Sequence, residues 1–181
     1  MRLILTTLPV AVLIGYFAGG RLSNLASVRL RFPLLALTGI VLQFLPVGGT
    51  YGYLLLVGSF AFLLAFAIAN ARGSGFALIY VGLALNLTVI AVNRGMPVTE
   101  HALVASGQEE TLRDLELHGG SKHHLATEED QLLFLGDVIA VPAPIRQAIS
   151  VGDIFAHLGV AWLVVRGMRR RGTPQLASAA A

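Results

Sequence analysis

Polar and ionisable side chains interrupt several apolar stretches of this chain, most notably near residue 150. Ser150, Asp153 and His157 are three and four residues apart, a spacing that places them on one face of a helix. A carboxylate and an imidazole one helical turn apart could act as a general base and the residue that orients it. We therefore predict Asp153 and His157 as candidate catalytic residues, and leave open whether the protein is an enzyme. The alternative is a capping box, in which Ser150 and Asp153 only complete the start of a helix.

Amide side chains lie in two other apolar stretches. Asn86 and Asn93 are seven residues apart and share a helix face, and Gln43 lies near the end of an earlier stretch. Strongly polar groups inside membrane-spanning helices are costly and indicate a functional site. We expect these residues and Ser150 to lie at similar depth, so we predict that together they line a ligand-binding pocket. The alternative is that the amides only form hydrogen bonds between helices.

The polar segment 93–148 contains three more charged residues that we predict to bind ligand: Arg94, Lys122 and Asp137. Lys122 is the only lysine of the chain and could bind a phosphate or a carboxylate, with a solvated turn as the alternative. Asp137 lies within an apolar run. If that run is buried, the carboxylate needs a positively charged partner such as Arg94, Lys122 or Arg146.

Two adjacent histidines, His123 and His124, are candidate metal ligands. With His118 and the nearby carboxylates they could hold Zn²⁺. Adjacent histidines cannot easily both reach one ion, so a solvated turn is the alternative, and the identity of any cofactor stays unknown. The chain has no P-loop, no G-x-S-x-G and no H-E-x-x-H sequence, so an ATPase, a serine hydrolase and a zincin have no sequence support.

The composition indicates that membrane-spanning elements position these residues. Of the 181 residues, 55% are hydrophobic and 13% are charged, whereas a soluble domain has about 25% charged residues. The absence of cysteine excludes disulfides, thiolate metal sites and a cysteine nucleophile. Basic residues flank the apolar stretches instead of clustering on one face, so we predict no nucleic-acid partner.

Five apolar stretches approach the length of about 20 residues that is needed to cross a bilayer. A helix satisfies its own backbone hydrogen bonds in lipid, so each stretch is predicted to be helical. The predicted fold class is therefore an all-α polytopic membrane bundle of five spans with a long, partly helical external segment. The spans are Leu3–Gly19, Pro33–Gly48, Tyr51–Asn70, Gly75–Val92 and Ile149–Val165.

The positive-inside rule gives the expected orientation. Five spans place the termini on opposite sides, and the arginines of the short connections favour an external N-terminus and a cytoplasmic C-terminus. The alternative for Leu3–Gly19 is a cleaved signal peptide. The predicted parts are a four-span bundle (1–92), an external segment (93–148), a fifth span (149–171) and a disordered cytoplasmic tail (172–181).

Two helices are predicted within the external segment. Ser106 and Thr127 each precede an acidic residue by three positions, the capping-box pattern that starts a helix. The first helix is predicted over 107–117. The second, over 128–139, has an apolar stripe but is too short to span, so we expect it to lie on the membrane surface or to re-enter the bundle as a lid.

Four motifs in this chain resemble the pattern of a known family. They are Asn93–Val98, Lys122–His124, Leu135–Ile139 and Ser150–Ile154. Together they resemble a family of bacterial integral-membrane proteins of about this length, catalogued only as a domain of unknown function, over essentially the whole chain. The family pattern has a proline directly after the Gly-Asp-hydrophobic run, where this chain has Ala140. The resemblance implies a bacterial cytoplasmic (inner) membrane protein of similar architecture, and no activity.

Three functions are compatible with these features. The first, which we favour, is a polar pocket in the outer half of the bundle that binds a lipid-like or amphipathic small molecule, with membrane lipid as the partner. The second is a non-enzymatic accessory or scaffold subunit whose external segment contacts a membrane-protein partner or a second copy of the chain. The third is a small-solute transporter, although the inner halves of the spans contain no ionisable residue.

Overall fold

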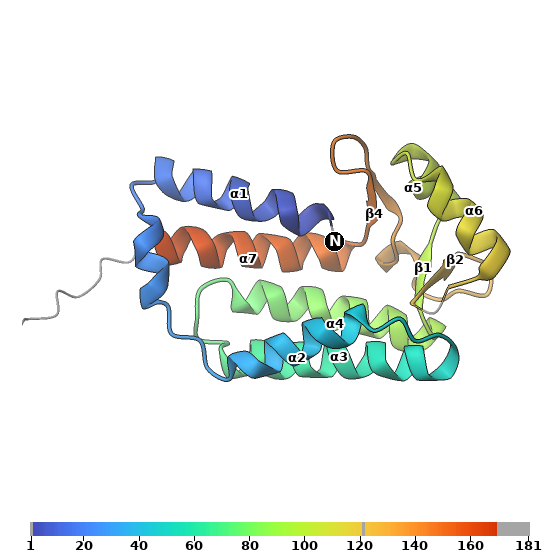
Figure 1. Cartoon of the computed structure of the whole chain (residues 1–181), viewed down its shortest axis with the longest axis horizontal. Helices are drawn as coiled ribbons and strands as arrows, with labels where there is room; N and C mark the ends of the chain where they lie inside the picture. The colour runs from blue at the N-terminus through green and yellow to red at the C-terminus, as the bar shows by residue number, and fades with distance from the viewer. Residues whose placement is uncertain (1, 121, 170–181) are drawn as a thin grey trace, which may run out of the picture.

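The computed structural model describes residues 2–120 and 122–169, so the predicted tail 172–181 lies outside the described residues. The described chain is mostly helical, in agreement with the prediction. Five long helices pack side by side, and the connecting segment (residues 94–150) forms a smaller unit at one end of them (Figure 1). The five helices are α1 (Arg2–Phe17), α2 (Pro33–Phe44), α3 (Gly49–Ala69), α4 (Phe76–Asn93) and α7 (Val151–Arg169).

Successive bundle helices alternate in direction, so their connections gather at two ends (Figure 1). One end holds the 3-10 helix η1 (Leu22–Ser27), the turn 70–75 and the end of α7. The other end holds the start of α1, the turn 45–48 and the connecting segment. All ten Asp and Glu residues lie between Glu100 and Asp153, so the first end contains none of them. We call it the arginine end.

Within residues 2–120 and 122–169, three helices are long and apolar enough to cross a bilayer: α3, α4 and α7. The helices α1 and α2 are apolar but have 16 and 12 residues, which is about 24 and 18 Å at the usual rise per residue. Helix α2 begins at Pro33, a residue that suits the first turn of a helix. Length and composition thus support three of the five predicted spans, and the crossing of α1 and α2 stays a prediction.

The outward faces of the bundle are apolar on all five helices. Large apolar side chains are exposed on each of them, including Leu13 on α1, Leu37 on α2, Leu54 on α3, Tyr80 on α4 and Leu158 on α7. A soluble protein rarely exposes so continuous an apolar surface, whereas a helix in lipid presents this surface to acyl chains. The exposed faces therefore suit a membrane on the two shorter helices as well as on the three longer ones.

The connecting segment contains four short strands that the all-α prediction did not include. The first two pair in parallel and place Met96 opposite His123. The other two pair antiparallel and place Ile139 opposite Ile149. The strands are β1 (Met96–Val98), β2 (His123–Leu125), β3 (Ile139–Val141) and β4 (Gln147–Ile149). Two helices, α5 (Glu100–Ala105) and α6 (Glu109–His118), connect β1 to β2, and α6 confirms the helix predicted over 107–117.

The helix predicted over 128–139 is wrong. This range forms a loop, a one-turn 3-10 helix, η2 (Leu133–Leu135), and the first residue of β3. The backbone N–H of Asp137 donates to the carbonyl oxygen of Pro97 at 2.9 Å, and the N–H of Thr99 donates to the carbonyl of Asp137 at 3.3 Å. These bonds to β1 and to the residue after it replace the hydrogen bonds within a helix, so the predicted lid helix does not form.

Two groups of buried apolar side chains form the cores. The bundle core includes Leu56, Phe60 and Val89, and Met96 of β1 belongs to it. Val98, two residues along the same strand, belongs to the core of the connecting segment. Strand β1 therefore joins the connecting segment to the bundle through buried side chains at both ends.

Candidate functional site

Asn86, Ser150 and Asp153 are brought together between α4 and α7. The Asn86 side-chain N–H donates to Asp153 Oδ1 at 2.8 Å, and the Ser150 hydroxyl donates to Asn86 Oδ1 at 2.8 Å. Ser150 Oγ also accepts from the Asp153 N–H, while Asp153 Oδ2 accepts from the Ser150 N–H. This is the reciprocal pattern of a capping box, here joined to a neighbouring helix. The three side chains use their polar atoms on each other.

His157 bonds the backbone instead of the Asp153 carboxylate. Its Nδ1 lies 2.8 Å from the carbonyl oxygen of Asp153, and because a carbonyl only accepts, Nδ1 carries the hydrogen. The carboxylate of Asp153 faces Asn86, so the expected pairing of this carboxylate with the imidazole is absent from the described contacts of these residues. The geometry therefore gives Asp153 a positioning contact between helices.

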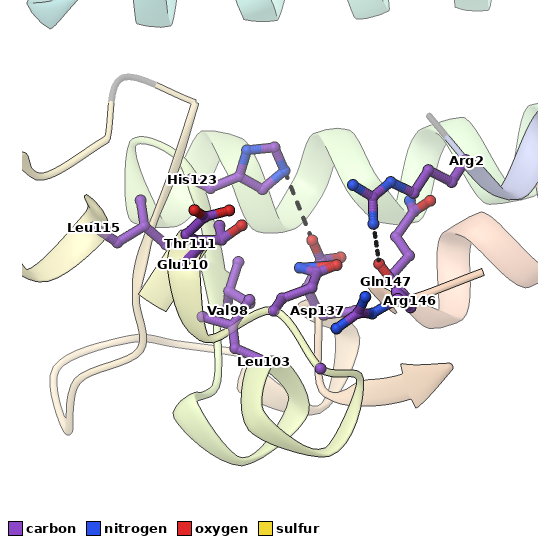
Figure 2. A pocket seen from close by; sticks show the side chains of 13 residues that line it. Arg2, Val98, Leu103, Glu110, Thr111, Leu115, His123, Asp137, Arg146 and Gln147 are labelled. Atoms are coloured by element: carbon purple, nitrogen blue, oxygen red, sulfur yellow. Dashed lines mark hydrogen bonds and ion pairs between the residues drawn. The ribbon is translucent and has the colours of Figure 1, made fainter. Parts of the chain in front are cut away.

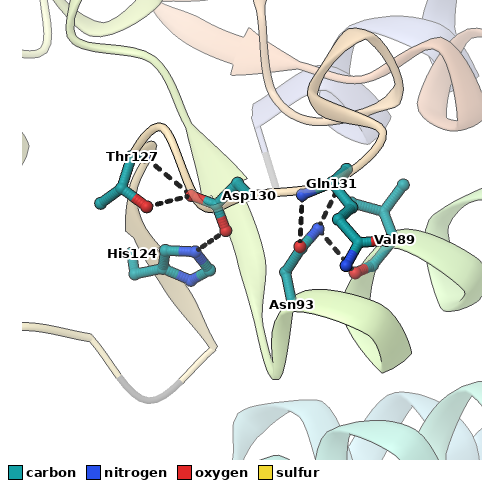
Figure 3. A network of polar contacts seen from close by, with 6 residues as sticks. All are labelled: Val89, Asn93, His124, Thr127, Asp130 and Gln131. Atoms are coloured by element: carbon teal, nitrogen blue, oxygen red, sulfur yellow. Dashed lines mark hydrogen bonds and ion pairs between the residues drawn. The ribbon is translucent and has the colours of Figure 1, made fainter.

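Asn93 and Gln43 lie in separate contacts from the Asn86 cluster. The Asn93 amide donates to the carbonyl of Gln131 and accepts from its N–H, both at 2.8 Å (Figure 3). The Lys122 ammonium donates to the backbone carbonyls of Gln43 and of Leu45, the latter at 3.2 Å. Both contacts attach the connecting segment to the ends of bundle helices. Gln43 contributes its backbone here, a contact that its side-chain type could not predict.

His124 forms a polar network with Asp130 and Thr127 (Figure 3). Its Nε2 lies 2.8 Å from Asp130 Oδ1, and Asp130 Oδ2 accepts from the N–H and the hydroxyl of Thr127. Burial acts to raise the pKa of Asp130, but the hydrogen bonds from Thr127 and His124 outweigh it and lower that pKa. Thr127 and Asp130 thus make the local hydrogen bonds of a capping box, although no helix follows.

The two adjacent histidines have different partners. On a strand, successive side chains point to opposite faces, and His124 bonds Asp130 while His123 Nε2 lies 3.7 Å from Asp137 Oδ2. Over residues 2–120 and 122–169, no three His, Asp or Glu side chains are placed to share a metal ion. Arg94 is exposed at the end of α4 with φ 56°.

Asp137 is the most unusual of the predicted residues. Its side chain is 10% exposed, and its Oδ1 is buried with no hydrogen-bond partner among the described residues. The 3.7 Å separation from His123 Nε2 is longer than a hydrogen bond. Burial raises the pKa of Asp137 well above its usual range, and the negative charge of Asp153 raises it further. The carboxyl therefore keeps its proton to a higher pH than an ordinary aspartate.

A cavity of about 450 Å³ lies against Asp137 (Figure 2). We call it the Asp137 cavity. Arg2 and Arg146 line it together with His123, and Glu110 lies on the α6 side. The rest of the wall mixes polar residues, Gln108, Thr111 and Gln147, with apolar ones, Val98, Leu103, Leu115 and Ala148. The cavity thus combines two guanidinium groups, an imidazole and a buried carboxyl with an apolar surface.

The start of α1 closes this cavity on one side. Arg2 Nη1 donates to the carbonyl oxygen of Arg146 at 3.4 Å (Figure 2). The Leu3 N–H donates to Gln147 Oε1 at 2.9 Å. Arg146 has a φ of 51°, in the left-handed region that residues other than glycine rarely adopt. Sequence reasoning did not select Arg2 as a ligand-binding residue. The only signal for it was its expected place on the outer side, the side that holds the connecting segment.

The described residues form a mostly helical protein, and three of its helices are long and apolar enough to cross a membrane. Residues 23–165 match a family of unknown function, DUF5317, and the chain belongs to that family. A protein of Thermotoga maritima, described as an uncharacterized protein, is 34% identical over 144 residues, or 78% of each chain. No solved structure matches the chain significantly.

Proposed function

We propose that this protein is an integral membrane protein that binds the anionic group of a lipid-like, amphipathic small molecule in the Asp137 cavity. One observation carries the proposal. Asp137 lines a cavity of about 450 Å³ that two arginines also line, yet one of its carboxyl oxygens is buried with no hydrogen-bond partner among the described residues.

The energetic cost of Asp137 supports a role in binding. A buried polar atom without a partner costs about 1–3 kcal/mol, and almost all such atoms in native proteins are paired. A fold that needed only packing at this position would be more stable with an apolar residue there. Strained or unsatisfied groups gather at functional sites. The left-handed backbone of Arg146 on the same cavity is a second such feature.

The chemistry of the wall indicates the kind of ligand. Arg2 and Arg146 bring two permanent positive charges, and a guanidinium binds a carboxylate or a phosphate through paired N–H groups. A protonated Asp137 can donate a hydrogen bond to an anionic oxygen, whereas an ionised one would repel it. Val98, Leu103 and Leu115 offer an apolar surface beside these groups. An amphipathic molecule with an anionic headgroup suits this combination of charged and apolar side chains.

The same proposal includes the predicted topology. We place α1 and α2 across the membrane with α3, α4 and α7, because all five helices expose apolar outward faces and alternate in direction. The positive-inside rule then puts the arginine end in the cytoplasm and the connecting segment outside a bacterial inner membrane. The Asp137 cavity faces the outer surface in this arrangement.

In this proposal the polar residues between α4 and α7 have a structural role: they hold the two helices together. Asn86, Ser150 and Asp153 are bonded to one another, so the proposed binding site is the Asp137 cavity and not the helix face that carries these residues. The proposal is for binding, and no reaction is assigned to the site.

Native mass spectrometry of the detergent-purified protein, with the released small molecules identified, tests the binding proposal. We expect a bound amphiphile with an anionic headgroup on the wild-type protein and its loss in the Arg146→Gln variant. The contact between Arg2 and Arg146 uses the backbone carbonyl of Arg146, so this substitution keeps it. Arg113→Gln is the matched control, because Arg113 is exposed on α6 and does not line the cavity.

Two outcomes would contradict the proposal. A wild-type protein that carries no small molecule would remove its basis, as would an equal loss of the molecule in Arg113→Gln and Arg146→Gln. A mass that contains a second polypeptide and no small molecule would favour the accessory-subunit alternative.

A further inference from the structure

A second cavity, of about 510 Å³, lies at the arginine end, at the opposite end of the bundle from the Asp137 cavity. Three separate parts of the chain form it: the segment after η1, the turn between α3 and α4, and the end of α7. Each part contributes arginine. The four arginines that line the cavity are Arg29, Arg31, Arg72 and Arg166. We call it the arginine cavity.

The walls of the arginine cavity are held in place by buried contacts. Asn70, which is 7% exposed, accepts from the N–H of Arg31 at 2.8 Å and donates to its carbonyl at 2.9 Å. Phe76, also buried, packs edge-to-face on Phe66 with ring centroids 5.5 Å apart. Gly167 of α7 lies close to the side chains of η1 and of the residue after it. The backbone that carries these arginines is therefore held in place by buried packing and hydrogen bonds.

Among the described residues, these arginines have no counter-ion. Within the part of the chain that the structure describes, the side chains of Arg29, Arg72 and Arg166 form no ion pair or hydrogen bond. No Asp or Glu occurs in the sequence outside 100–153, and those residues belong to the other end of the molecule. Four like charges around one cavity repel one another, so an anion from outside the chain would stabilise this arrangement.

We propose that the arginine cavity binds the phosphate group of an anionic phospholipid. The cavity lies where α3, α4 and α7 begin or end, which is the depth of the lipid headgroups for helices that cross a bilayer. Guanidinium groups bind phosphate oxygens through paired N–H groups. Ile68 and Leu163 line the same cavity, and the exposed Ile68 continues into the apolar outer surface, where acyl chains can follow. Basic pockets between helices on the cytoplasmic side bind such headgroups in other membrane proteins.

The proposal is independent of the Asp137 cavity, because the two cavities share no residue and lie at opposite ends. Either site could be occupied without the other. Its test therefore uses substitutions at the arginine end alone.

Titration of the detergent-purified full chain with cardiolipin, followed by native mass spectrometry, tests the site. We expect Arg72→Gln with Arg166→Gln to weaken cardiolipin binding about thirtyfold, since each arginine near a membrane surface contributes about fivefold. Neither side chain has a described partner, so the double variant keeps the contacts of the fold. An unchanged melting temperature of the lipid-free protein verifies this.

The matched control is the double variant Arg21→Gln with Arg169→Gln. It removes the same charge at the same end of the molecule, and neither residue lines the arginine cavity. We expect this control to bind cardiolipin within a few-fold of the wild-type protein. An equal loss in the two double variants would show a general charge effect and would overturn the proposal, as would no loss in either.

Two further probes separate the sources of the phosphate group. Phosphatidylcholine is zwitterionic, and we expect it to bind the wild-type protein and the cavity variant equally. Inorganic phosphate tests for a site that needs no acyl chain, and we expect millimolar phosphate to leave cardiolipin bound. If it displaces cardiolipin from the wild-type protein, and by itself raises the melting temperature of that protein but not of the cavity variant, the ligand is free phosphate and the lipid proposal is wrong.

Discussion

Asn86 of α4 donates a 2.8 Å hydrogen bond to the carboxylate of Asp153, which at the same time accepts from the N–H of Ser150 at the start of α7. One carboxylate thus caps one helix and fixes its distance from another. Asn86 completes the arrangement by accepting from the Ser150 hydroxyl. Asn86, Ser150 and Asp153 are satisfied by one another, which gives them a role in helix packing that a ligand does not need to share.

Loss of the Asn86 side chain is expected to destabilise the contact between α4 and α7. Hydrogen bonds between membrane helices contribute about 0.6 kcal/mol each, with a maximum near 1.7, and Asn86→Ala also leaves the buried Ser150 hydroxyl without its acceptor. We expect a loss of about 1–2 kcal/mol, measured as a lower melting temperature in detergent. Thr88→Ala is the control, because the Thr88 hydroxyl bonds only its own helix. If Asn86→Ala keeps full stability but loses a bound molecule, Asn86 belongs to a ligand site instead.

The close approach of α4 and α7 depends on glycine at positions 82 and 152. A Cβ at Gly152 would overlap the side-chain oxygen of Asn86, and one at Gly82 would overlap the backbone of α7. The Cβ at Gly152 would also overlap the backbone carbonyl oxygen of Gly82. Gly152→Ala is therefore expected to lower the melting temperature strongly, because backbone atoms cannot move aside cheaply. A Cβ at Gly58 of α3 would have no atom within 4 Å, so Gly58→Ala is expected to be neutral or stabilising by about 0.5–1 kcal/mol. Equal effects of the two substitutions would contradict this packing.

Asp137 is expected to make stability depend on pH. Its folded-state pKa is raised, so the folded protein binds a proton that the unfolded chain releases near pH 3.9. The stability that this proton contributes is fully present below about pH 3.9 and is lost as pH rises through the folded-state pKa. The charged and titratable groups that face Asp137 or raise its pKa are Arg2, Glu110, His123, Arg146 and Asp153.

Asp137→Asn removes this dependence, since the amide resembles the protonated carboxyl. We expect the variant to gain stability over the wild-type protein at mildly alkaline pH, by about 1.4 kcal/mol for each unit of pKa shift. The gain is expected to vanish near pH 4, and Glu116→Gln, at an exposed position of α6, is expected to show none. Melting curves across this pH range measure both differences. A gain that is constant with pH would show that Asp137 has an ordinary pKa.

The predicted orientation can be tested with single cysteines, because the chain has none of its own. Labelling of intact cells with an impermeant maleimide is expected to modify Glu116→Cys on α6 and Gly48→Cys, just before α3. Ala71→Cys, in the turn between α3 and α4, is expected to react only after the cells are permeabilised. The reverse pattern would show that the arginine end is outside.

The variant Ser27→Cys, at the end of η1, distinguishes five spans from three. If α1 and α2 both cross, position 27 lies at the arginine end with position 71 and is protected in intact cells. If α2 does not cross, position 27 lies on the same side as position 48, and both cysteines are labelled together.

The bundle was predictable from the sequence because its signals are local. Apolar stretches predicted α1, α3, α4 and α7 to within a few residues, and Pro33 marked the start of α2, although α2 ends at Phe44 and not at the predicted Gly48. The connecting segment was less predictable. The apolar stripe over 128–139 suits a helix, but the same residues form a strand-like contact of Asp137 with β1, a partner about 40 residues earlier in the chain. Pairing at such a separation depends on the whole fold and outweighs the local preference.

In the candidate site, too, some features could be predicted from the sequence and others depend on the tertiary fold. Residue types and their order were enough to show which side chains carry charge, that the acids lie in one segment, and that Asp137 lies in an apolar run. The burial of Asp137 without a full set of partners, and the position of Arg2 beside Arg146, 144 residues away, emerged from the packed fold alone. Residue type fixes what a group can do, whereas burial and the positions of distant charges fix its pKa and its neighbours, and these arise only when the helices pack.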